Sequence, residues 1–104
     1  MDGSTILDAL ADRTRRRLLA TLTRRPMTVR ALGAELGVTA SAASQHLKIL
    51  REAGLVVCRA DGKQRLYRLA PAALESTQQA VAQLLRPPRT EPVQASGDDL
   101  RAMA

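Results

Sequence analysis

Residues 32–47 decide the fold of this chain, and they read LGAELGVTASAASQHL. Leu32 and Leu36 lie one helical turn apart, and Gly37 can adopt the backbone conformation that ends a helix. Thr39 then serves as an N-cap for a second helix. Three small residues would let the two helices cross closely: Gly33, Ala34 and Ala43. The stretch therefore predicts a helix-turn-helix, with a plain helical hairpin as the alternative.

Two further helices are expected before this stretch. Ser4 or Thr5 would cap a short first helix, and Asp12 or Thr14 would start a second one that runs through Thr23. Leucines recur at helical spacing in the second helix, which favours a buried face. The helix that opens the helix-turn-helix is expected over residues 29–36, with Thr28 as its N-cap.

After Gly54 the hydrophobic period changes. Residues 55–59 and 65–69 are typical of strands, and the Asp61-Gly62 dipeptide between them favours a tight turn. Pro71 is expected to lie in the first turn of a fifth helix. The chain is thus predicted to be mainly α with a small β-hairpin, in the order α-α-α-α-β-β-α of a winged helix-turn-helix. This domain would cover residues 1–86, and residues 87–104 are expected to form a disordered tail.

Composition limits the functions that such a fold could serve. The 104 residues suit one domain, and the formal net charge is +6, concentrated before residue 70. A basic surface of this kind favours a polyanionic partner, although it could also be merely solvated. Tyr67 is the only aromatic residue, so stacking on single-stranded nucleic acid is not expected. The lone Cys58, the absence of an apolar membrane-length stretch and the acidic start of the chain predict a cytoplasmic protein.

The fourth helix is expected to present a polar face to DNA. At about 100° per residue, Ala43 and Leu47 fall on one side of it, and Gln45 and Lys48 fall nearly opposite. Hydroxyl, amide and ammonium groups suit base edges and phosphates in a major groove, although a solvated helix face can look similar. His46 lies between the two sides, where a partly buried, hydrogen-bonded histidine is an equal alternative to a DNA contact.

The predicted hairpin would form a basic wing that follows the DNA backbone. Its charges could instead protect an edge strand from aggregation. Together, the fourth helix and the wing supply eight residues that we expect to contact DNA: Thr39, Ser41, Ser44, Gln45, His46, Lys48, Lys63 and Arg65.

Three motifs resemble those of ArsR-type repressors. Residues 7–19 are similar to the opening of these proteins, residues 43–56 to their recognition helix and its exit, and residues 62–69 to their wing. Arg13 is a departure, because the family often has proline there. The resemblance implies a homodimer, joined through the first and last helices, that represses promoters by occupying an operator.

Dimerisation is also expected from the sequence itself, because the two end helices carry more apolar residues than a monomer would expose. Five residues are expected at the dimer interface: Ile6, Leu10, Leu74, Val81 and Leu84.

Neither metal site of the ArsR-type family is matched. One family site is a Cys-x-Cys on the helix that corresponds to residues 28–36, which contain no cysteine here. The other uses histidines and carboxylates on the last helix, where Glu75 is the only such residue. Zinc or a soft metal needs three or four such ligands, so no metal and no cofactor is predicted. Cys58 alone cannot form a dithiol redox pair.

Two other classes of function compete with that of a DNA-binding repressor. A winged-helix module that binds protein instead of DNA is the main alternative, and a salt titration on duplex DNA would separate the two. An enzyme is not expected, because one histidine, one cysteine and scattered carboxylates leave no nucleophile with its base.

Overall fold

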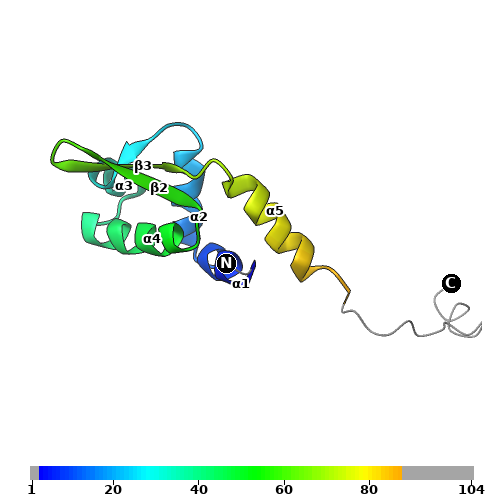
Figure 1. The fold of residues 1–104 in the computed structure, drawn as a ribbon. Helices are drawn as coiled ribbons and strands as arrows, with labels where there is room; N and C mark the ends of the chain where they lie inside the picture. Colours follow the sequence, from blue (N-terminus) through cyan, green and yellow to red (C-terminus); the bar gives the residue numbers. More distant parts are fainter. Residues whose placement is uncertain (1–2, 88–104) are drawn as a thin grey trace, which may run out of the picture.

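The computed structural model describes residues 3–87, which form five helices and three strands (Figure 1). The helices are α1 (Gly3–Leu10), α2 (Arg13–Leu22), α3 (Val29–Leu36), α4 (Ala40–Glu52) and α5 (Ala73–Leu84). The strands are β1 (Met27–Thr28), β2 (Val56–Asp61) and β3 (Gln64–Leu69). The predicted helix order and hairpin are confirmed. The tail predicted from residue 87 onward lies, except for Pro87, outside the described residues.

The small sheet has one strand more than the sequence indicated. Its three antiparallel strands lie in the order β1-β3-β2, so the hairpin of β2 and β3 is extended by β1. Met27 pairs with Tyr67, and Thr28 pairs with Leu66. The sequence predicted the two strands of the hairpin but missed β1. A strand of two residues is too short to show an alternating hydrophobic pattern.

The core lies where α2, α3 and α4 pack beneath the sheet. Its largest fully buried side chains come from three helices and the root of the hairpin: Leu18, Leu32, Leu47, Leu50, Leu55 and Val56. Met27 and Tyr67, which face each other in the sheet, close this core from above. Burial of these groups is the main stabilising contribution to a domain of this size.

Three helices begin at the same kind of side-chain cap. Asp12, Thr28 and Thr39 each accept a hydrogen bond from the backbone N–H three residues later, which satisfies one of the free donors at a helix start. The bond from the Arg15 N–H is the largest influence on Asp12, and together with the charge of His46 it lowers the pKa of that carboxyl against the opposing effect of burial. Thr28 and Thr39 were predicted as caps, and Asp12 or Thr14 was predicted to start the second helix.

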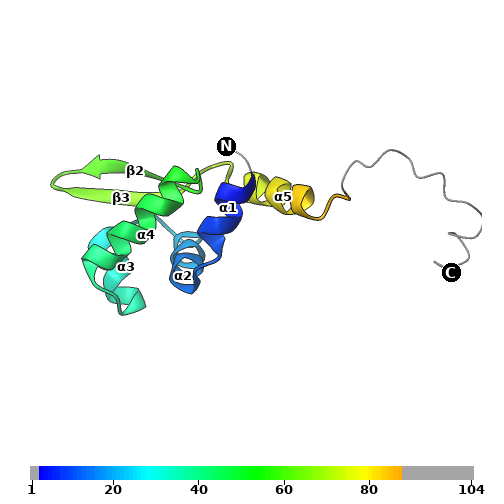
Figure 2. The same cartoon turned by 90° about the horizontal axis from the view of Figure 1, so that it is seen from below.

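Helix α5 packs against α1 and then runs away from the body of the domain, at the end opposite the wing (Figures 1 and 2). Ala73 and Ala80 are buried, whereas larger apolar side chains on other faces of the same helix remain exposed. Among the helices of residues 3–87, none combines the length and the apolar character needed to cross a lipid bilayer.

Candidate nucleic-acid interface

The turn between α3 and α4 depends on two glycines. The Val38 N–H donates to the Gly33 carbonyl over 2.9 Å, and a Cβ added at Gly33 would lie 2.9 Å from the Val38 carbonyl oxygen. Gly37 adopts a φ of +72°, which side chains with a Cβ rarely accept. Ala43 is fully buried at the crossing, whereas Ala34 is exposed and does not serve the close approach expected of it. The short turn fixes the start of α4 relative to α3.

Helix α4 is divided sharply between a buried and an exposed side. Ala43, Leu47 and Leu50 are fully buried, as their spacing predicted. The side chains expected to face DNA are exposed at the other side, and they are Ser41, Ser44, Gln45 and Lys48. Small hydroxyls and one amide on an exposed helix face can enter a major groove and bond to base edges. This face is the part of the molecule best suited to read sequence.

Thr39 and His46 are already engaged within the protomer. The Thr39 hydroxyl oxygen accepts from the Ala42 N–H at 3.0 Å, so its own hydrogen remains for a DNA contact. Nδ1 of His46 lies 3.4 Å from Nη1 of Arg15 and 3.7 Å from Oδ2 of Asp12, and the side chain is 25% exposed. These contacts favour the hydrogen-bonded structural role for His46 over the DNA contact.

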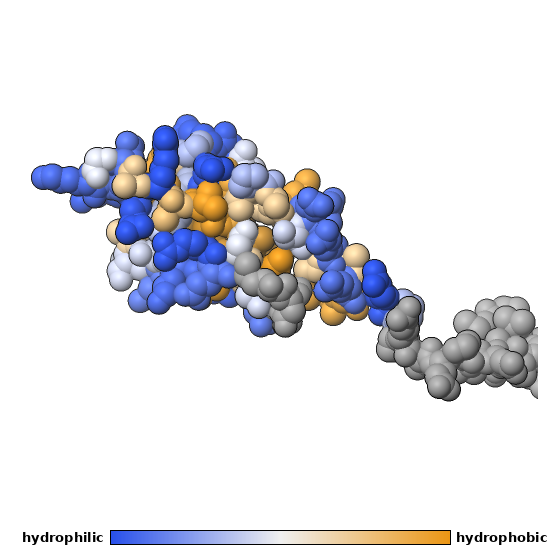
Figure 3. Space-filling model, viewed as in Figure 1, coloured by the Kyte–Doolittle hydropathy of each residue, from blue (hydrophilic) through white to orange (hydrophobic). Residues whose placement is uncertain are grey.

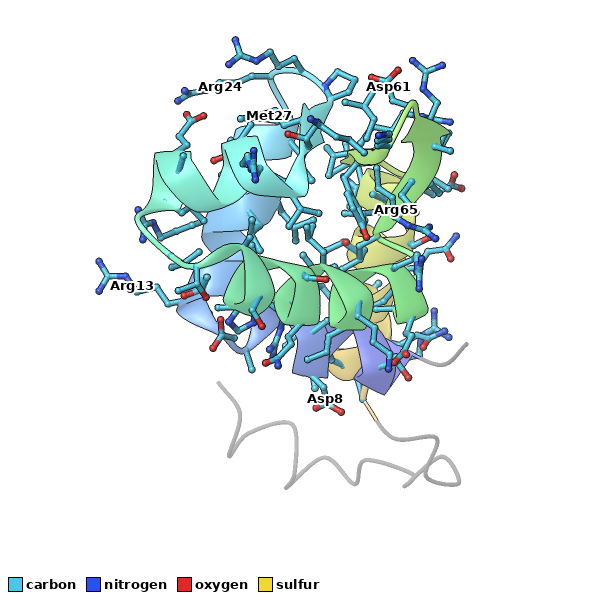
Figure 4. All side chains as sticks on the ribbon, turned by 90° about the vertical axis from the view of Figure 1, so that its left-hand side faces the viewer. Asp8, Arg13, Arg24, Met27, Asp61 and Arg65 are labelled. Carbon is cyan, nitrogen blue, oxygen red and sulfur yellow. The ribbon has the colours of Figure 1, made fainter. Side chains whose placement is uncertain are left out.

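Arg15 joins three helices around this histidine. Its Nε donates to the Ala9 carbonyl at 2.6 Å, and its Nη2 donates to the Asp8 carbonyl at 3.0 Å. The guanidinium therefore closes the C-terminal end of α1 while it contacts His46 on α4. Arg13, by contrast, points away from the domain (Figure 4).

The wing projects from the domain as the outer part of the β2–β3 hairpin (Figure 1). Its turn contains Gly62 at a φ of +63°, next to the exposed Lys63. Side chains alternate between the faces of a strand, so Arg65 shares a face of β3 with the buried Tyr67. Arg65 therefore points toward the helices, and Figure 4 shows it on the side of the wing that faces α4. The structure thus gives the two wing cations different surroundings.

Cys58 lies in β2 between two guanidinium groups. Its Sγ accepts from Nη1 of Arg51 at 3.5 Å and from Nη1 of Arg65 at 3.6 Å. Burial acts to raise the pKa of the thiol, but the two hydrogen bonds and the two positive charges outweigh burial and lower it. The expected packing of Cys58 in the wing is observed, while the arginine contacts could not be read from the sequence.

A cleft separates the helix-turn-helix from the wing. It has a volume of about 290 Å³ and is lined by six residues: Thr28, Val29, Arg30, Ala40, Gln64 and Arg65. Arg30 was not among the predicted site residues, because a single arginine early in α3 gives no signal in the sequence. Arg30 and Arg65 both line the cleft, although the two are far apart in the chain.

The residues expected at a dimer interface divide into two groups. Ile6 is only 6% exposed and belongs to the core of the protomer itself, and Leu10 is half-buried. Leu74, Val81 and Leu84 are 71%, 40% and 63% exposed on α5. Figure 3 shows hydrophobic residues along α5, whereas the wing tip at the opposite end is hydrophilic. The exposed apolar surface therefore comes mainly from α5.

A tight helix-turn-helix, an exposed polar face on its second helix and a basic wing define a winged helix-turn-helix protein of the nucleic-acid-binding class. A family model described as a helix-turn-helix domain matches residues 10–59. A solved structure described as a possible transcriptional regulator for arsenical resistance superimposes with a TM-score of 0.72. It is 38% identical, and the match covers 100% of this chain and 97% of that one. The chain belongs to the ArsR-type family of winged helix-turn-helix transcriptional regulators.

Two curated relatives agree with this assignment. The HTH-type transcriptional regulator Rv2034 of Mycobacterium tuberculosis is 46% identical over 66 residues, which are 64% of this chain and 62% of that protein. The biofilm growth-associated repressor of Agrobacterium fabrum is 42% identical over 65 residues, or 62% of this chain and 56% of that protein. The matched part of the chain thus spans about three-fifths of the length of these relatives.

Proposed function

We propose that this chain is a sequence-specific double-stranded DNA-binding protein that represses transcription by occupying an operator as a homodimer. The observation that carries the proposal is the exposed polar face of α4, formed by Ser41, Ser44 and Gln45, beside a basic wing. A protein-binding module would not need this combination of groove-sized polar groups and cations. The name of the Agrobacterium relative supports repression over activation.

The homodimer is supported by the apolar surface of α5. Leu74, Leu84 and Leu85 are each more than 60% exposed, and Val81 lies on the same helix. A second copy of α5, related by a two-fold axis, would cover them with like residues, and Leu10 of α1 lies at the margin. Two recognition helices would then face two half-sites of one operator.

The proposed protein acts without catalysis and without a metal or another cofactor, in the cytoplasm. Within residues 3–87, no three His, Cys, Asp or Glu side chains gather as a metal site would require. The single histidine and the single cysteine contact arginines, which do not favour a cation nearby. These features support the proposal that the described part of the chain holds no metal site of its own.

Fluorescence anisotropy on two duplexes tests the proposal. One duplex is an operator obtained by selection from a random library, and the other is a random sequence of the same length. We expect binding to both at low salt, a steep loss of affinity with rising salt, and at least about a thousandfold preference for the operator. Absence of binding to either duplex at low salt would favour the protein-binding module.

A further inference from the structure

The cleft between the helix-turn-helix and the wing has a composition that suits an anion. Arg30 approaches it from the first turn of α3 and Arg65 from β3, while the Gln64 amide adds a further donor. None of the six lining residues is acidic. Among the ion pairs within residues 3–87, none involves Arg30 or Arg65, and the Arg65 guanidinium donates to Sγ of Cys58 through Nη1 alone. Two cations that converge on one cleft without a carboxylate leave room for a negatively charged group.

The position of the cleft points to the source of that anion. Ala40, the first residue of α4, forms part of its wall, and the polar face of α4 starts next to it at Ser41. When that face enters a major groove, the strand that borders the groove must pass between the start of α4 and the wing. A backbone phosphate would then lie over the cleft, where the positive end of the α3 helix dipole also favours negative charge.

The size of the cleft agrees with a phosphate. About 290 Å³ is at the lower limit for a site that encloses an organic ligand, and the cleft is open to solvent. A phosphodiester with a few water molecules is smaller and needs no enclosure. Each guanidinium can offer two parallel N–H donors to phosphate oxygens.

We propose that Arg30 and Arg65 form a clamp that grips a single backbone phosphate of the operator from both sides. This inference rests on the proposed DNA binding. It adds Arg30 to the DNA-contacting residues and assigns the cleft as the binding site of one phosphate. The clamp fixes the wing against the helix-turn-helix when DNA is bound, because one phosphate bonds to both. Arg65 is thereby a positioning residue for the recognition helix as well as a cation of the wing.

The salt dependence of binding tests whether the two arginines share a phosphate. Arg30→Ala and Arg65→Ala should each weaken binding on the order of three- to tenfold, equally on operator and random duplex. The affinity of the double variant for DNA should fall by less than the product of the two single-variant factors. Its slope of log affinity against log salt should fall by roughly one unit, because one phosphate contact is lost. Losses that multiply, with a slope change of roughly two units, would mean separate phosphates and would overturn the clamp.

Two arginines serve as matched controls. Arg68→Ala removes a cation from the opposite face of β3, and Arg25→Ala removes an exposed one that does not line the cleft. Neither should show coupling with Arg30→Ala, and coupling of similar size would contradict the proposal. At a pH at which the Cys58 thiol is protonated, all variants should keep the thermal midpoint of the wild type, since the four arginines are exposed.

Two further measurements identify the source of the phosphate. Duplexes with one neutral methylphosphonate at successive positions should show a site where wild type loses affinity and the double variant does not. Inorganic phosphate should weaken DNA binding no more than chloride of equal ionic strength. Stoichiometric release of DNA by inorganic phosphate, dependent on Arg30, would instead assign the cleft to a free anion. If wild type bound no DNA at all, the proposed function would fail, whereas normal binding by the double variant would refute the clamp alone.

Discussion

Gly33 and Val38 approach so closely that a methyl group on Gly33 would lie 2.9 Å from the Val38 carbonyl oxygen. Gly33→Ala should therefore destabilise the domain by about 1–3 kcal/mol, because the turn has to shift. At an unhindered helical position the same change would stabilise the domain by about 0.5–1 kcal/mol. The sign of the change in the free energy of unfolding therefore shows whether the close contact is present. Urea unfolding at fixed protein concentration measures it. Ala34→Ser, at the exposed neighbour, should change stability by less than about 0.5 kcal/mol.

Gln45 and Lys63 should affect DNA binding in different ways. Gln45→Ala is expected to cost about 1–3 kcal/mol on the operator and little on random duplex, because a lost base contact matters only where the right base is present. Lys63→Ala should weaken both by similar factors and flatten the salt dependence. Affinities for both duplexes at several salt concentrations separate the two effects. Equal losses on both duplexes for Gln45→Ala would show that α4 does not read bases.

The apolar face of α5 should hold the dimer together. Val81→Asp would place a charge against the partner and raise the dimer dissociation constant roughly a hundredfold, or about 3 kcal/mol. Gln79→Asp introduces the same charge at an exposed position across the helix and should leave the dimer intact. Sedimentation velocity gives the oligomeric state of each variant. An unmodified protein that is monomeric at micromolar concentration would contradict this prediction.

The thiol of Cys58 should ionise more readily in the folded protein than in the unfolded chain. Since its folded-state pKa is lowered, it contributes stability above the unfolded-state pKa, and this contribution is lost as pH falls through the folded-state pKa. The pH profile of iodoacetamide alkylation reports it without interference, because Cys58 is the only cysteine. Arg51→Ala and Arg65→Ala should move the midpoint upward. Arg68→Ala should leave the midpoint unchanged. An equal shift of the midpoint in this variant would mean that the net charge of the protein, and not the contacts of Cys58, lowers the pKa of the thiol.

Added zinc, cadmium or arsenite should not release the protein from its operator. A tight site needs three or four nitrogen, sulfur or carboxylate ligands, and one protomer has a single histidine and a single cysteine. Anisotropy of the preformed complex during a metal titration checks this expectation. Stoichiometric release that Cys58→Ser or His46→Ala abolishes would reveal a site shared between subunits.

Local signals explain why most of the fold could be predicted from the sequence. Thr28, Thr39 and Gly37 mark helix ends through bonds that span only a few residues, and the spacing of Leu47 and Leu50 marks the buried face of α4. These local signals do not depend on how the helices pack against one another. The polar face of α4 follows from the same periodicity, so the exposure of Ser44 and Gln45 could be predicted as well.

The features that the sequence did not indicate depend on contacts between distant segments. Strand β1 exists because Met27 meets Tyr67 across the sheet, and Ile6 is buried because α1 lies on the core. The contact of His46 with Arg15 spans 31 residues, and Arg30 and Arg65 line one cleft although they come from α3 and β3. No spacing rule encodes such pairs, since they arise only once the helices are assembled.

The position of Arg15 has a mechanical consequence for the whole molecule. One guanidinium holds two carbonyls at the end of α1 and contacts the imidazole on α4, while α1 is packed against α5. If α1 and α5 move together against α2, the bonds of Arg15 must either break or move α4 along with them. A displacement of α5 would thus reach α4, the helix proposed to face DNA, through α1 and the Arg15 guanidinium as well as through the direct packing of α1 on α4.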